Sequence, residues 1–157
     1  MGTLYDEDIL LWSEQQADLL RRLARGERVN DAIDWENLIE EVDDVGRSEF
    51  NRVASLLEVG LTYLLLVHAA PGPDPVAHWR VEARAALAGA ARRFSPSMGP
   101  RLDLGELWAL ALANVRDKLA AEGGPAAPLP ATCPFAVEDL TKRQPDLDAL
   151  LARLATA

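Results

Sequence analysis

Residues 34–69 carry the longest uninterrupted helical pattern in the sequence, and this pattern limits the fold more than any other feature. Apolar residues recur there at three- and four-residue steps, and no proline occurs until Pro71. Asp34 is a favourable N-cap residue. The stripe comprises Trp35, Leu38, Ile39, Val42, Gly46, Phe50, Val53, Leu57, Leu61 and Leu64. We therefore expect one long helix over about residues 34–69, with a bend near Gly46 or Gly60.

The last third of this helix is apolar on nearly all sides. A helix segment of this kind is buried on several faces, either at the centre of a bundle or at an interface between subunits. The candidate interface residues are Leu61, Tyr63, Leu64, Leu65 and Leu66. The apolar run is about half of the ~20 residues that a bilayer requires, so the sequence predicts a buried helix there and no membrane span.

The rest of the chain also follows a helical period, and no segment alternates with the period of a strand. We expect further helices over about 4–25, 76–94 and 103–122, and a Pro-rich loop over 125–134. A helical turn follows near Val137–Leu140, and Pro145 is expected at the N1 position of a short C-terminal helix. The prediction is an all-α single domain over residues 1–157, a bundle of four main helices of which the second is long.

The amino-acid composition limits the classes of function that the chain could have. The chain of 157 residues has 16 basic and 25 acidic residues, a formal net charge of −9. This balance argues against a broad basic surface for nucleic acid, which would require clustered Lys and Arg. The single cysteine, Cys133, cannot form an intrachain disulfide, and the acidic N-terminus lacks a signal peptide. A cytoplasmic location without membrane attachment is the expectation.

Most of the negative charge lies in one segment. Residues 34–49 hold seven carboxylates against Arg47 alone, a net charge of −6. Glu36, Glu40 and Asp43 fall within about 60° of one another on a helix, beside the apolar stripe, and Arg47 follows one turn later. The acidic face comprises Glu36, Glu40, Glu41, Asp43 and Asp44.

Three readings of this acidic face remain open. A carboxylate row beside a core stripe is how helical bundles present oxygen ligands to divalent cations, here Glu36, Glu40 and Asp43. The face could instead meet a partner or basic groups of the same chain, or it could simply be solvated near the positive end of the helix dipole. No Glu-x-x-His motif accompanies it, so no metal or other cofactor is predicted, and a divalent cation is the alternative.

Two arginines of the expected third helix could complement this charge. Arg80 and Arg84 are four residues apart on one helix face. They are candidates for pairing with Glu40, Asp43 or Asp44, or for binding a phosphate or another anion. The four tryptophans fall one per predicted helix on the apolar stripes, and we expect them to form a core cluster.

Four blocks of the sequence resemble the bacterial domain-of-unknown-function family 29. They are Leu11-Trp12-Ser13-Glu14-Gln15-Gln16-Ala17, the segment from Asp34-Trp35-Glu36 to Gly46-Arg47-Ser48-Glu49, and the later His78-Trp79-Arg80 and Cys133-Pro134-Phe135 motifs. The resemblance spans about residues 4–140 and implies an all-helical fold with no assigned reaction. Where relatives tend to show His-Leu-Leu-Lys, this chain has Tyr63-Leu64-Leu65-Leu66, which weakens any metal or acid–base mechanism.

The sequence identifies no catalytic residue and favours a binding role over an enzymatic one. We expect a small soluble helical module that acts through protein–protein contact, as a homodimer or with another protein. One alternative is a metal-dependent hydrolase or nuclease-like enzyme that uses Glu36, Glu40 and Asp43 as ligands. A third reading is an acidic, antitoxin-like regulatory partner.

Overall fold

The computed structural model describes residues 2–157, and every regular element in that range is helical. The all-α prediction is therefore confirmed. The α-helices are α1 (Leu4–Glu7), α2 (Ile9–Ala24), α3 (Trp35–His68), α4 (Val76–Arg93), α5 (Leu104–Ala120), α6 (Val137–Leu140) and α7 (Leu147–Thr156). Short 3₁₀ helices, η1 (Asn30–Ala32) and η2 (Pro96–Arg101), precede α3 and α5.

Two helix starts differ from the expectation, and in both an aspartate is the reason. The helix expected over 4–25 is divided by Asp8, whose carboxylate accepts a hydrogen bond from Leu11 N at 3.0 Å and caps α2. Pro145 is not at N1 of α7, because Asp146 is the N-cap and accepts from Ala149 N at 3.0 Å. A side-chain acceptor for the first free N–H groups decides where each helix begins.

The chain divides into two compact units, Met1–Ser48 and Glu49–Ala157, where the sequence predicts one domain over 1–157. We call them unit 1 and unit 2. Unit 1 contains α1, α2, η1 and the first part of α3, and unit 2 contains the remainder of α3 and all later helices. Each unit is described by itself.

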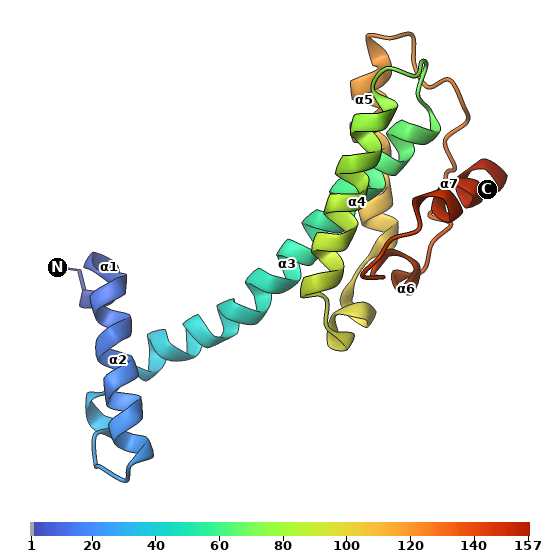
Figure 1. The fold of residues 1–157 in the computed structure, drawn as a ribbon. Helices are drawn as coiled ribbons and strands as arrows, with labels where there is room; N and C mark the ends of the chain where they lie inside the picture. The colour runs from blue at the N-terminus through green and yellow to red at the C-terminus, as the bar shows by residue number, and fades with distance from the viewer. Residues whose placement is uncertain (1) are drawn as a thin grey trace. The chain divides into compact units, whose positions relative to one another are not determined.

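Unit 2 contains the large hydrophobic core. The later part of α3 lies side by side with α4 and α5, while α6 and α7 pack on the same bundle (Figure 1). The core includes Val53, Leu57, Leu61 and Leu64 of α3, Leu87 of α4 and Trp108 of α5, all of them 0–1% exposed.

Close packing of α3 against α4 depends on a glycine. A Cβ atom built on Gly60 would lie only 2.6 Å from Leu87 Cδ2 and 2.9 Å from Leu87 Cγ. The absence of a side chain at Gly60 therefore lets the Leu87 side chain approach the α3 backbone.

By length and composition alone, α3 would be long and apolar enough to cross a membrane. Five of its leucines, however, are buried in the core of unit 2 together with residues of α4, α5 and α7: Leu57, Leu61, Leu64, Leu65 and Leu66. The core helix of a helical bundle has the same composition, which agrees with the buried helix predicted from the sequence.

Unit 1 has a very small core. Among its described residues, only three side chains are buried, those of Trp12, Gln16 and Ile33. The Tyr5 and Trp12 rings pack edge to face with their centroids 4.9 Å apart. Few buried apolar groups are therefore available to stabilise the first 48 residues.

Candidate interaction surface

The apolar stripe of α3 is covered along one half and bare along the other. Val53, Leu57 and Leu64 are fully buried, whereas Trp35, Ile39 and Val42 are 44%, 60% and 66% exposed. We call residues 35–46 of this stripe the bare half, and residues 53–64 the covered half. Both halves have helical spacing and apolar residues, so these features do not distinguish the exposed part from the buried part.

Helix length explains where the cover ends. α3 has 34 residues, but α4 has only 18 and α5 only 17. Arg93, the last residue of α4, places its Nη1 3.1 Å from Glu49 Oε2 on α3. Within unit 2, α4 therefore covers α3 back to about Glu49. This mismatch in length is present in the sequence and could have identified the bare half.

Further apolar side chains are exposed elsewhere in unit 1. Among the residues that the structure describes, seven of the ten exposed large hydrophobic residues belong to this unit, although it has less than a third of the chain: Ile9, Leu10, Leu11, Trp35, Ile39, Val42 and Val45. Isolated exposed apolar residues are common in proteins, but a concentration of this kind is a candidate for an interaction surface.

Polar contacts hold the start of α3 against α2. The Asp34 carboxylate accepts hydrogen bonds from Trp12 Nε1 at 3.0 Å and from Asn37 Nδ2 at 2.8 Å. Gln16 Oε1 accepts from Asp34 N at 2.8 Å. The hydrogen bonds from Asn37 and Trp12 lower the pKa of Asp34 below its ordinary value. Buried Gln16 thus satisfies the backbone at the point where α3 begins.

A second polar contact joins α1 to α3. Tyr5 Oη donates a hydrogen bond to Glu41 Oε1 at 2.6 Å. This bond, with the negative charge of Glu41 as a further contribution, raises the pKa of Tyr5 to about 12. Glu41 is therefore engaged within unit 1, unlike Glu36, Glu40 and Asp43 of the acidic face.

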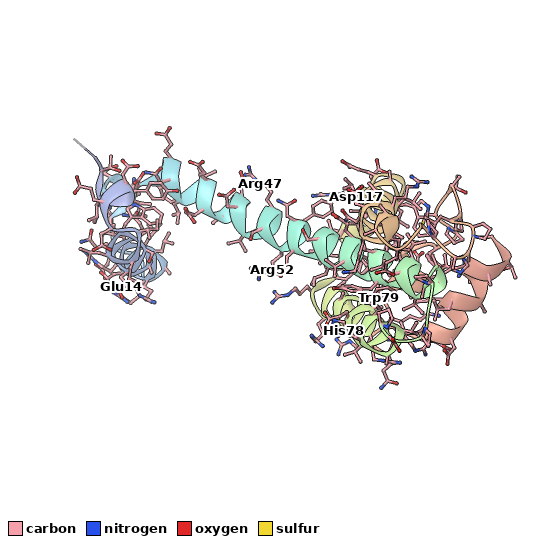
Figure 2. The ribbon with its side chains drawn as sticks, turned by 90° about the horizontal axis from the view of Figure 1, so that it is seen from above. Glu14, Arg47, Arg52, His78, Trp79 and Asp117 are labelled. Carbon is pink, nitrogen blue, oxygen red and sulfur yellow. The ribbon has the colours of Figure 1, made fainter. Side chains whose placement is uncertain are left out.

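The carboxylates of the predicted row are exposed. Glu36, Glu40 and Asp43 have no salt bridge among the contacts of the described residues. Arg47 pairs with Asp44 at 2.9 Å, an exposed i,i+3 pair of small energetic value. Figure 2 shows the Arg47 side chain projecting outward from α3. The row flanks the bare half and is free to meet charges on another molecule.

No ligand set for a metal accompanies the row. Within residues 2–157, no group of three or more His, Cys, Asp or Glu side chains is arranged to hold an ion. The two histidines lie elsewhere: His68 Nε2 is 2.9 Å from Pro128 O, and His78 is exposed on α4 (Figure 2).

Burial raises the pKa of the Cys133 thiol. A thiol with a raised pKa is unsuited to act as a nucleophile.

The arginines of α4 have other partners than those expected. Arg80 Nη2 lies 2.7 Å from Asp148 Oδ1 of α7, and Arg84 Nη1 donates to Pro145 O at 3.4 Å. These contacts differ from the predicted pairing with Glu40, Asp43 or Asp44. Arg80 and Arg84 hold the C-terminal segment to α4, a role that the i,i+4 spacing alone does not reveal.

The residues expected to form an apolar interface are buried within this chain, except for Tyr63. Leu61, Leu64, Leu65 and Leu66 are 0–1% exposed inside unit 2, and Tyr63 is half-buried. These leucines are core residues of one chain and offer no surface to another. Of the four tryptophans expected in the core, Trp12, Trp79 and Trp108 are buried. Trp35 is not, because it belongs to the bare half.

The fold and this surface define an all-helical protein with an uncovered apolar helix face. The family model named Domain of unknown function DUF29 matches residues 4–144, so the chain belongs to this family. This confirms the resemblance found in the sequence.

One solved structure is similar over nearly the whole chain. It is an alpha-helical protein of unknown function from Rhodospirillum rubrum, with 31% identity and a TM-score of 0.73. The alignment covers 98% of this chain and 99% of that chain. Among curated proteins there is no significant match. The relatives therefore establish the fold and the family, and they attach no reaction to it.

Proposed function

We propose that this protein is a helical protein-interaction module, and that its contact surface is the bare half of the α3 stripe. The observation that carries the proposal is the imbalance of unit 1, which has three buried side chains and seven exposed large hydrophobic ones. A unit of 48 residues with so small a core commonly needs a partner to stabilise it.

Burial of this surface by a partner would contribute favourable free energy to binding. Complete burial of a Val, Leu or Ile side chain contributes about 1.5–3 kcal/mol. Ile39 and Val42 together with Trp35 would supply several kcal/mol, in the mode by which helices dock along i, i+4, i+7 positions. The homodimer expected from the sequence would use this same surface, in place of the buried leucines.

The enzymatic alternative has less support. A metal-dependent hydrolase would need a second ligand-bearing segment facing Glu36, Glu40 and Asp43, and the described residues place none there. A regulatory partner of the acidic type is a special case of the interaction module, since it would bind through the same charged flank.

Site-specific photo-crosslinking tests the proposal. A benzophenone amino acid at position 39 is expected to form adducts above the mass of one chain in cells of the organism that encodes it. The matched control is position 81, where Val81 is 63% exposed on α4 of unit 2. Adducts at 39 that disappear when Trp35 is changed to Asp support the proposal. Equal adducts at both positions, or none at 39, would overturn it.

A further inference from the structure

We infer that the occupant of the bare half is a basic amphipathic helix from another protein. This inference rests on the proposed function and specifies its partner. It follows from three properties of the surface: the spacing of the apolar residues, an open glycine within them, and the sign of the charge along their flank.

The spacing matches a helix better than a strand or a loop. Trp35, Ile39, Val42 and Gly46 stand at i, i+4, i+7 and i+11, in line with the stripe that α4 and α5 cover further along α3. The bare half is about 17 Å long at 1.5 Å per residue, which corresponds to about three turns of a partner helix. The same helix already binds helices along the rest of this stripe.

Gly46 gives a partner room for close approach. Apart from its chain neighbours and the adjacent backbone of its own helix, no atom of the described residues lies within 4 Å of a Cβ built on Gly46. The other stripe glycine, Gly60, has such space filled by Leu87 of α4. A glycine inside a helix costs about 1 kcal/mol relative to alanine, and a helix that crosses at Gly46 would offset this cost as α4 does at Gly60.

The acidic row beside the bare half determines the charge that we expect of the partner. Glu36, Glu40 and Asp43 are exposed beside the stripe without salt bridges inside the described chain, and Arg47, the one base of residues 34–49, is paired with Asp44. A helix with Lys or Arg beside its apolar face would place opposite charges along this row. An acidic or neutral helix would gain no such contacts.

A second copy of this chain is a poor fit for the same reason. Residues 1–48 hold 13 carboxylates against five arginines, a net −8, whereas residues 49–157 have a net charge of only −1. Pairing two bare halves would bring together two copies of the segment 34–49. Each copy has a net charge of −6 and contains Arg47 as its single base. Like charges across an interface oppose association.

A pair of synthetic peptides tests the inference with the full-length protein. Both are helical, about 20 residues long, with leucine on one face, and they differ only in flanks of lysine or of glutamate. Trp35 is the exposed tryptophan, so its fluorescence reports binding. The lysine peptide is expected to bind with a Kd on the order of 10 μM. Its affinity should weaken about tenfold as salt rises from low to about 0.5 M, and the glutamate peptide should bind at least tenfold more weakly.

Variants locate the contact on the surface. Val42→Asp should abolish peptide binding, and Gly46→Leu should weaken it about tenfold or more by filling the open space. Val81→Asp, at an exposed position of α4, is the control and should bind like the unchanged protein. The triple change Glu36→Lys, Glu40→Lys and Asp43→Lys should reverse the preference, so that the glutamate peptide binds better.

The outcomes separate this inference from the proposed function. Equal affinity for the two peptides, or no binding of the lysine peptide, would overturn the basic partner. The basic partner would also be overturned if light scattering at micromolar concentration gave the mass of two chains, and the Val42→Asp variant gave the mass of one chain. In these cases, crosslinks at position 39 would still support the proposed interaction module, but with a different molecule bound at the bare half. Absence of those crosslinks would remove both.

Discussion

At the scale of single residues, the carboxylate of Asp34 joins two helices that the sequence shows only as separate patterns. It accepts from Trp12 on α2 and from Asn37 in the first turn of α3. These hydrogen bonds favour the ionised form and lower its pKa. The stabilisation they give is present above the unfolded pKa of aspartate and is lost as the pH falls through the lowered value.

The Tyr5–Glu41 contact gives a prediction at high pH. In a Tyr63→Phe variant, Tyr5 is the one remaining tyrosine, and its ionisation can be followed by tyrosinate absorbance. We expect a midpoint near 12. Because the folded pKa exceeds the ordinary value of 10.0, the contact stabilises fully below pH 10 and its contribution is lost as the pH rises through 12.

The control for this titration is Glu41→Gln in the same background. Removing the negative acceptor should move the Tyr5 midpoint down toward 10.0, with little change in the circular dichroism at neutral pH. Identical midpoints in the two proteins would show that Glu41 does not hold the Tyr5 hydroxyl.

At the scale of the elements, the two halves of the α3 stripe predict opposite responses to the same kind of substitution. Leu57→Ala leaves a cavity in the core of unit 2 and should lower the free energy of unfolding by about 2–5 kcal/mol. Ile39→Ala, on the same helix, removes an exposed side chain and should change it by no more than about 0.5 kcal/mol. Urea unfolding measures both, and equal losses would mean that Ile39 is buried in solution.

Most of the helices could be predicted from the sequence, because hydrophobic periodicity and prolines mark them. α3, α4 and α5 end within two residues of the expected bounds. The break at Asp8 was missed since Tyr5, Ile9 and Trp12 keep helical spacing across it. Hydrophobic periodicity indicates which face of a helix is apolar. It does not show where a side chain caps the backbone and begins a new helix.

The candidate site was predicted in part. The acidic row and the stripe beside it were recognised, but their partners were not. Leu64 and Val42 have the same chemical character, and what separates them is whether another helix reaches them. Likewise, the Arg80 side chain could have met several carboxylates, and the tertiary structure selects Asp148.

At the scale of the whole molecule, the two units should differ in local stability. The amides of α3 between Val53 and Leu66 are surrounded by the core of unit 2, whereas unit 1 has three buried side chains. Local opening free energies follow the number of buried apolar contacts. Hydrogen exchange should therefore be at least about a hundredfold slower in residues 53–66 than in residues 9–24.

Mass spectrometry of peptide fragments resolves these segments, and the lysine peptide provides a second condition. Its addition should slow exchange in residues 35–46 and leave residues 104–120 of α5 unchanged. Uniform protection over both units without any peptide would contradict the small core assigned to residues 1–48.

The bare half of α3 also has a consequence for how related sequences change over time. The covered half packs against α4 and α5, which the same gene encodes. A change at Gly60 can therefore be compensated within the chain, for example at Leu87. If the proposed partner binds the bare half, the residues there are constrained by a different gene. We therefore expect Ile39 and Val42 to co-vary with positions in another protein encoded by the same genomes, and to drift toward polar residues wherever that protein has been lost.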